Sequence, residues 1–377
     1  MPHSDGEMAA REPGKFLPRI FLDTLMAHKA AAAQANRALG ALPDDVAHAI
    51  AQQAQALRTG FPDDPGPSLW QSGCGLETNR WANARIALAC LRAGVPATPE
   101  QVNRNQSTND TFPTVLQLSL LRAYLAQLHP ACDLLRARLR DSAARMGERL
   151  VMGRTFLRDA KWMPLSQIVG GWADLVQAHH EWLALAASAL GTIPLGGYSL
   201  GNGDGVDPGF AAAYAVRWNA SEDVPCRLSA APSSEMAGIR CVAAFGGALG
   251  ALAGGIEKMA GDVLLLCSGP EHGFADLGFQ ESAADSTTLL GKSNPKQATT
   301  LLMACAYART QGGLAVDLAA RGQLAVFTGF PLLAHVLLDA VHVLAQQTHV
   351  FAAEFVPSLH PLKPAGVSDP TPQEPVA

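Results

Sequence analysis

The feature that most constrains the fold is a stretch of sixteen residues without a charged side chain, Cys241–Ile256, between Arg240 and Glu257. It is shorter than the roughly 20 apolar residues that a membrane span needs, and it is rich in glycine. Small residues let neighbouring helices pack closely. The stretch therefore predicts a buried helix covered by other helices, and no membrane span.

Composition extends this prediction to the whole chain of 377 residues. Hydrophobic residues make up 48% and charged residues only 16%, so much apolar area must be buried within the subunit or against another one. Aromatic residues are few, at 6%, while alanine and leucine dominate, which favours helices over sheets. The net charge of -5, with no block of like charge, argues against a nucleic-acid partner.

Helical periodicity and turn residues divide the chain into segments. In the segment that starts at Pro113, apolar residues recur on one face, and Pro130 should kink the helix. The remaining predicted helices are Phe16–Leu39, Pro43–Leu57, Thr78–Ala93, Leu165–Leu190, Ser233–Leu266, Pro295–Thr310 and Pro331–Glu354. Long helices with short loops form bundles, so we expect an all-α fold.

The expected organisation is a smaller N-terminal helical domain over residues 16–110 and a central helical bundle over residues 111–356. Residues 1–15 and the proline-rich residues 357–377 are expected to be disordered. Seven cysteines without a C-x-x-C spacing, and an N-terminus without an apolar core, indicate reduced thiols in the cytoplasm. The adjacent His179 and His180 are expected to be a solvated or interfacial pair, with no metal site.

Three loops are more polar than a simple connection requires: WQSGCGLETN (70–79), NQSTNDTFPT (105–114) and ADSTTLLGKSNPKQ (284–297). Each presents small hydroxyl, amide or glycine groups at the start of a helix, where unpaired N–H groups and the helix dipole favour an anion. Each loop alone is also explained by ordinary helix capping. Together they predict an oxyanion-binding site.

These loops also carry a family resemblance. The second and third signatures of the fumarase and aspartase superfamily resemble QSTNDTFPT and DSTTLLGKSNPKQ. The first substrate loop of class II fumarases is similar to WQSGCGLETN. The family's stretch around G-R-T-H resembles GRTFLRDAKWMPLSQ (153–167). Order and spacing agree from roughly Phe16 to Pro357. The chain is identified as a divergent member of this superfamily.

The resemblance implies a fold and a reaction. The fold is a central bundle of five long helices per subunit, joined in a homotetramer with a twenty-helix core and active sites shared between subunits. The reaction is reversible elimination from a succinyl skeleton, a small dicarboxylate or N-substituted aspartate, to fumarate or a related alkene. No metal or organic cofactor is implied. The small C-terminal domain of the family is expected to be absent.

The resemblance also implies roles for individual residues. Ser286 matches the catalytic base, and Lys292 and Asn294 match groups that stabilise the aci-carboxylate formed when the proton leaves. Substrate-binding positions fall on Asn79, Ser107, Thr108, Asn109 and Thr155.

Several positions depart from the family pattern. The histidine after G-R-T is Phe156, and its usual glutamate partner is Thr299, so this pair cannot relay a proton. Cys74 and Leu76 replace a serine and a threonine in the first loop, and Asp285 replaces the glycine before Ser286. These changes predict a substrate pocket that is more apolar than one made for malate, with Cys74 and Phe156 among its residues.

Three functions are compatible with this sequence. The first is a lyase with Ser286 as base that acts on a dicarboxylate with an apolar or bulky substituent. The second is an inactive relative that serves as a binding or structural module. The third is a weak fumarate hydratase that works through water alone.

Overall fold

The computed structural model describes residues 16–58, 66–280 and 286–362. The predicted disorder of residues 1–15 falls outside these ranges, as does Asp285. The chain divides into two compact units: Met1–Ala123, Ala186–Gly246 and Leu314–Asp339 form the first, and Tyr124–Leu185, Gly247–Gly313 and Ala340–Ala377 form the second. The boundary proposed from the sequence at residues 110 and 111 stays a prediction.

The first unit is a cluster of helices. It contains α1 (Arg19–Ala38), α2 (Asp44–Leu57), α3 (Leu76–Arg92), α4 (Pro99–Val102), α5 (Thr108–Ala123), α8 (Phe210–Ser221) and α9 (Pro232–Gly238), with a short parallel pair of β3 (Thr192–Ile193) and β4 (Arg227–Leu228). Helix α1 packs against α2, α5 and α8. Phe112 contributes to the core between Phe21 and Phe330, with ring centroids 4.7 and 5.9 Å away.

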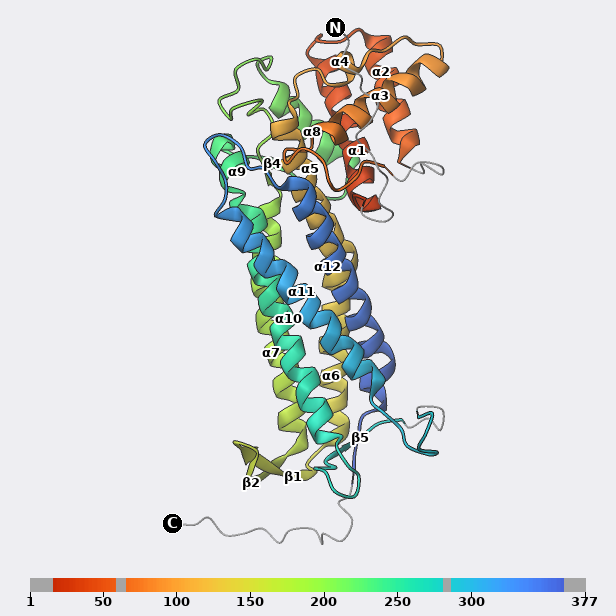
Figure 1. Ribbon diagram of the computed structural model, residues 1–377, viewed down its shortest axis with the longest axis vertical. Coiled ribbons are helices and arrows are strands. Elements are labelled where there is room, and N and C mark those ends of the chain that lie inside the picture. The colour runs from red at the N-terminus through yellow and green to blue at the C-terminus, as the bar shows by residue number, and fades with distance from the viewer. Residues whose placement is uncertain (1–15, 59–65, 281–285, 363–377) are drawn as a thin grey trace. The chain divides into compact units, whose positions relative to one another are not determined.

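The second unit is built mainly from five long helices: α6 (His129–Met146) and parts of α7 (Leu165–Leu190), α10 (Arg240–Leu266), α11 (Lys296–Ala319) and α12 (Phe330–Val350). Figure 1 shows these helices as a bundle. Polar contacts join Arg136 of α6 to Gln177 of α7, Trp172 of α7 to Asp262 of α10, and Glu257 of α10 to Arg309 of α11. The predicted all-α bundle is confirmed.

The path of the second unit departs from regular helix at both ends of this bundle. A π-helical turn, η1 (Tyr124–Leu128), precedes α6, and another, η2 (Phe351–Phe355), follows α12 and leads into η3 (Val356–Ser358). Pro130, where the sequence predicts a kink, lies in the first turn of α6. A proline has no N–H and cannot complete the i to i−4 hydrogen bond, which explains the widened turn just before it.

One prediction about the elements was wrong, and two elements were missed. Ser233–Leu266 is not one helix, because Ile239 adopts a left-handed φ of 40° directly after Gly238 and separates α9 from α10. Residues 150–164 form an antiparallel hairpin, β1 (Leu150–Thr155) and β2 (Arg158–Pro164), that the helical patterns did not indicate. In addition, helix α8 was missed.

The prediction of a disordered tail over residues 357–377 is wrong for residues 357–362. These residues are ordered, because β6 (His360–Pro361) pairs with β5 (Leu277–Gly278) and Leu359 is buried. Residues 363–377 lie outside the described part of the chain.

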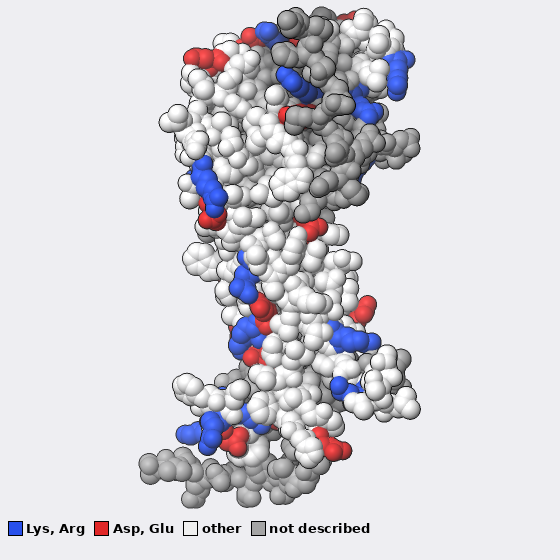
Figure 2. Space-filling model, in the orientation of Figure 1, with Lys and Arg blue, Asp and Glu red and all other residues white. Residues whose placement is uncertain are grey.

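Charged side chains are sparse on the face drawn in Figure 2, with wide uncharged areas between them. Large apolar side chains are exposed on the long helices, among them Trp182, Leu185 and Met303. Within the described residues no single helix is apolar and long enough to cross a membrane; only the bent pair of α9 and α10 passes that test of length and composition.

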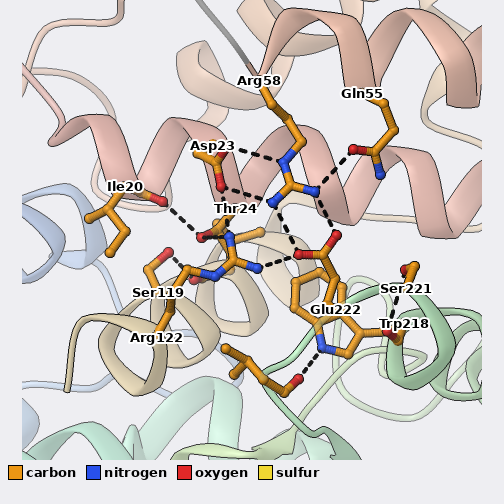
Figure 3. A network of polar contacts seen from close by, with 12 residues as sticks. Ile20, Asp23, Thr24, Gln55, Arg58, Ser119, Arg122, Trp218, Ser221 and Glu222 are labelled. Atoms are coloured by element: carbon orange, nitrogen blue, oxygen red, sulfur yellow. Dashed lines mark hydrogen bonds and ion pairs between the residues drawn. The ribbon is translucent and has the colours of Figure 1, made fainter. Parts of the chain in front are cut away.

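A cluster of four charges holds the helices of the first unit together (Figure 3). Arg58, after α2, and Arg122 of α5 both bind Asp23 of α1 and Glu222 at the end of α8. The side chain of Glu222 is only 4% exposed. Because a buried charge that loses its partners is costly, these four residues fix the mutual positions of α1, α2, α5 and α8.

Replacing Glu222 tests this cluster. Glu222→Gln keeps the shape but removes one of the two carboxylates that the guanidinium groups share, so the free energy of unfolding should fall by about 3 kcal/mol in urea denaturation. Arg321→Gln, which removes an exposed ion pair with Asp317, is the control and should cost less than about 1 kcal/mol. Equal losses in the two variants would contradict the role given to Glu222.

Candidate functional site

The second polar loop rests on buried polar groups of α1. The side-chain oxygen of Gln106 accepts a hydrogen bond from Lys29 Nζ at 3.0 Å and lies 3.1 Å from His28 Nε2, while its amide group donates to the carbonyl oxygens of Val102 and Arg104. Because that oxygen only accepts, Nε2 of His28 carries the proton and Nδ1 accepts from the Tyr214 hydroxyl at 3.0 Å. Gln106 is thereby fixed in one orientation.

Burial sets the protonation of these groups. It lowers the pKa of His28 to about 3, assisted by the charge of Lys29, so the imidazole is neutral at physiological pH. Burial also lowers the pKa of Lys29 to about 7, and Asp110 opposes this shift. The loop is therefore supported by a neutral histidine and by an ammonium group that titrates near neutral pH.

Asp110 joins the second loop to the turn at residues 195–203. Its carboxylate accepts N–H groups of Ser107 at 2.9 Å, Gly196 at 3.1 Å and Tyr198 at 2.9 Å. Burial raises the pKa of Asp110 to about 7, while these three hydrogen bonds and Lys29 oppose the shift. The Asp110 carboxylate thus serves as a structural acceptor inside the protein. The neighbouring side chains of the second loop remain available to other partners.

The first and second loops meet at Asn79. Its amide group donates to Thr108 Oγ1 at 3.1 Å and to Asn103 Oδ1 at 3.0 Å. Its own side-chain oxygen is buried and has no hydrogen-bond partner among the described residues. Two of the predicted substrate-binding residues, Asn79 and Thr108, are therefore in contact.

The other predicted residues of these two loops serve local contacts. Ser107 Oγ accepts the N–H of Asn109, and the Asn109 side chain donates to the carbonyl oxygen of Ser199 at 3.0 Å. Cys74 is half-buried, with its sulfur 3.8 Å from Ser72 Oγ. Gly75, next to it, has a φ of 83° and no room for a Cβ against the Phe112 ring, so only glycine fits at the start of α3.

The third loop places its predicted base in a turn. Ser286 Oγ accepts the N–H of Leu289 at 2.9 Å, and Lys292 N–H bonds to the Leu289 carbonyl oxygen at 3.1 Å. Ser286 and Asn294 are half-buried, Lys292 is exposed, and α11 begins two residues after Asn294. An N–H group directed at Ser286 Oγ stabilises negative charge on that oxygen, which a serine needs to act as a base.

Thr155 and Phe156 lie at the end of the β1–β2 hairpin. Phe156 and Leu157 form its two-residue turn with φ values of 53° and 59°, a geometry that asparagine and glycine usually supply. The Phe156 side chain is fully exposed. Thr155 is paired with Arg158 across the turn.

The predicted site residues are divided between the two units. Residues of the first and second loops belong to the first unit: Cys74, Asn79, Ser107, Thr108 and Asn109. Residues of the hairpin and third loop belong to the second unit: Thr155, Phe156, Ser286, Lys292 and Asn294. The assignment of roles to these residues stays a prediction.

Sequence reasoning missed the support beneath the second loop. Lys29 is the only charged residue in the alanine-rich stretch from Met26 to Asn36, and a single lysine in such a face is the available signal for a buried ammonium group. Asp110 lies within the second polar loop, and no local pattern indicates that its carboxylate binds the N–H groups of Gly196 and Tyr198.

The structure defines a helical-bundle protein with three polar loops, and comparison with known proteins gives the family. A family described as Lyase matches residues 10–309. The fumarate hydratase class II of Chromobacterium violaceum is 32% identical over 88% of this chain and 74% of its own length, and that of Methylorubrum extorquens is 33% identical over 86% and 70%. The chain belongs to the fumarase and aspartase superfamily of lyases.

A solved structure supports the fold assignment. The crystal structure of recombinant class II fumarase from Schistosoma mansoni superposes with a TM-score of 0.88, covering 92% of this chain and 78% of that one at 24% identity.

Asp110→Asn tests the support of the second loop. An amide keeps one accepting oxygen and has an NH₂ group in place of the other, so backbone N–H groups of either the loop or the 195–203 turn lose their acceptor. We expect the free energy of unfolding to fall by about 2 kcal/mol in urea denaturation. Asp141→Asn, on an exposed side chain of α6, is the matched control and should change it by less than about 1 kcal/mol. A loss no larger than that of the control would contradict the structural role of Asp110.

Proposed function

We propose that this lyase catalyses reversible anti-elimination of a C–O or C–N substituent from a succinyl substrate, with Ser286 as the base. The observation that carries the proposal is the third loop, where the N–H of Leu289 is directed at Ser286 Oγ and is followed by Lys292, Asn294 and the N-terminus of α11. Removing a proton beside a carboxylate creates a doubly negative aci-carboxylate. The cation, the amide and the helix terminus are the groups that stabilise it.

The proposed substrate differs from malate at the leaving group. Phe156 and Thr299 stand where fumarases have a histidine and a glutamate, and neither side chain transfers a proton. Leu76 and Cys74 make the first loop less polar than a pair of hydroxyl groups would. These residues favour a dicarboxylate with an apolar or bulky substituent, such as an N-substituted aspartate.

The proposed active unit is a homotetramer with shared sites. Two observations support it: exposed apolar side chains on the long helices, such as Trp182 and Met303, and charged residues at only 16% of the chain. Large apolar patches on a helical surface are ordinarily covered by a partner. A second copy of this chain would supply such a surface.

The first experiment is a substrate screen with a matched pair of variants. Malate, aspartate and N-substituted aspartates are followed through the absorbance of the fumarate double bond, in both directions. Ser286→Ala should lower kcat/KM by roughly 10²–10⁴-fold, the range of one acid–base group. Thr288→Ala, an exposed hydroxyl of the same loop, should leave the rate near wild type.

Two results of that screen would contradict the proposal. Activity that survives in Ser286→Ala excludes this serine as the base. A dicarboxylate that raises the melting temperature without turnover, in any direction, supports the alternative of a binding module, for which the fully exposed Phe156 is the favouring observation.

A second experiment restores the missing relay. Phe156 and Thr299 are both exposed, so the double variant Phe156→His with Thr299→Glu should fold. Its rate of fumarate hydration should exceed that of wild type by at least about tenfold, because an acid–base pair again handles the water proton. Phe156→Leu is the control for removal of the ring. A double variant no faster than wild type would show that the absence of the relay does not determine the leaving group.

A further inference from the structure

Two imidazole rings face each other in the second unit, outside the three polar loops. Nδ1 of His129, at the start of α6, lies 3.0 Å from Nε2 of His180 in α7. Asp133, one turn after His129, lies beside the remote nitrogen of each ring, 3.5 Å from His129 Nε2 and 3.8 Å from His180 Nδ1. The expectation that His180 lies in a solvated or interfacial pair with His179 and has no ligand-type neighbour is therefore wrong: its neighbours come from α6.

The π-helical turn η1 adds a fourth group to this cluster. Tyr124 and His129 are five residues apart, and a turn with i to i+5 spacing places both on one side of the helix. The Tyr124 hydroxyl lies 3.3 Å from His129 Nδ1 and 3.1 Å from His180 Nε2. Three donor atoms therefore form a triangle with sides of 3.0 to 3.3 Å.

The protonation of the two rings suits metal binding. Two nitrogens 3.0 Å apart cannot both carry a proton, so at least one of them presents a lone pair. The facing geometry therefore leaves an unprotonated nitrogen on one of the two rings, and an unprotonated nitrogen is the form of imidazole that ligates metals.

The triangle also has the dimensions of a coordination sphere. For metal–nitrogen bonds of about 2.1 Å, adjacent donor atoms lie about 3.4 Å apart in tetrahedral and about 3.0 Å apart in octahedral geometry. The side chains of His129 and Asp133 are 45% and 43% exposed, which leaves a path for an ion and positions for water. His180 is 8% exposed and gives the cluster a rigid side.

We propose that His129 and His180 bind a divalent transition-metal ion of the Zn²⁺ class through Nδ1 and Nε2. The Tyr124 hydroxyl lies beside the open positions, and Asp133 orients both rings through their remote nitrogens. A carboxylate behind a ligating imidazole is a recurrent arrangement that fixes the ring and raises its basicity. Imidazole ligands suit Zn²⁺, Cu²⁺, Ni²⁺ and Co²⁺ and do not suit Mg²⁺ or Ca²⁺.

The test uses the full chain without an affinity tag, stripped of metal with a chelator and titrated with Zn²⁺ and then with Co²⁺. Calorimetry should give one site per chain, and Co²⁺ should produce visible absorption bands of a nitrogen-ligated ion. His129→Gln and His180→Gln should each weaken binding at least about tenfold, and Asp133→Asn should weaken it to a smaller extent. His272→Gln and His349→Gln, at exposed histidines elsewhere, are the matched controls and should bind as wild type.

The alternative is that the two rings share only a hydrogen bond with each other and with Tyr124. In that case Zn²⁺ binds wild type no more tightly than the double variant His129→Gln with His180→Gln, and this result overturns the proposal. Preferential binding of Mg²⁺ or Ca²⁺ also overturns it. If circular dichroism shows that the change at buried His180 disturbs folding, the Zn²⁺ affinity of His129→Gln alone tests the proposal, because His129 is half exposed.

Discussion

The long helices of this protein carry so little charge that each must bury its apolar surface against the others. Helix α10 is the clearest example. Its charged residues are Arg240, Glu257, Lys258 and Asp262, and each has a partner: Arg240 binds Glu235 of α9, Glu257 binds Arg309 of α11, and Asp262 receives Lys258 and the indole N–H of Trp172 on α7. Between them lie the sixteen uncharged residues, in which six side chains from Val242 to Ile256 are at most 1% exposed. The apolar surface drives packing, and the few charges determine which helices become neighbours.

The same constraint explains how far the sequence predicts the fold. A helix that buries one face has a 3.6-residue period that can be seen in the sequence, so Leu165–Leu190 was predicted with the bounds that the structure has. The break at Ile239 was not, because a left-handed residue other than glycine leaves no local pattern. The hairpin at residues 150–164 was missed for a related reason: β2 is mostly exposed and lacks the alternation of a half-buried strand.

Prediction of the site was limited by distance along the chain. Motif spacing placed Asn79 and Thr108 at the site, and the structure shows them in contact. The groups that support them, His28 and Lys29, lie nearly 80 residues from Gln106, and no pattern within one segment reveals such a pairing. His129 and His180 are 51 residues apart and meet only because α6 and α7 pack together. In both clusters the partners come from different helices, so spacing within one helix indicates the residues of one helix at most.

The hairpin turn connects backbone geometry to the question of the leaving group. Phe156 and Leu157 both adopt left-handed φ values, at a cost of roughly 1–2 kcal/mol for each residue with a side chain. No burial offsets that cost at Phe156, because the ring is fully exposed in the single chain. Such an exposed aromatic tip is stabilised when a second surface covers it, and the shared active site of the proposed tetramer is a surface of that kind. In that setting the phenyl ring would face the substrate as an apolar wall, where a histidine would handle a proton. Under the proposed function, the strained turn and the loss of the relay have one common explanation: a pocket that keeps the carboxylate end of the family's chemistry and selects a different group to leave.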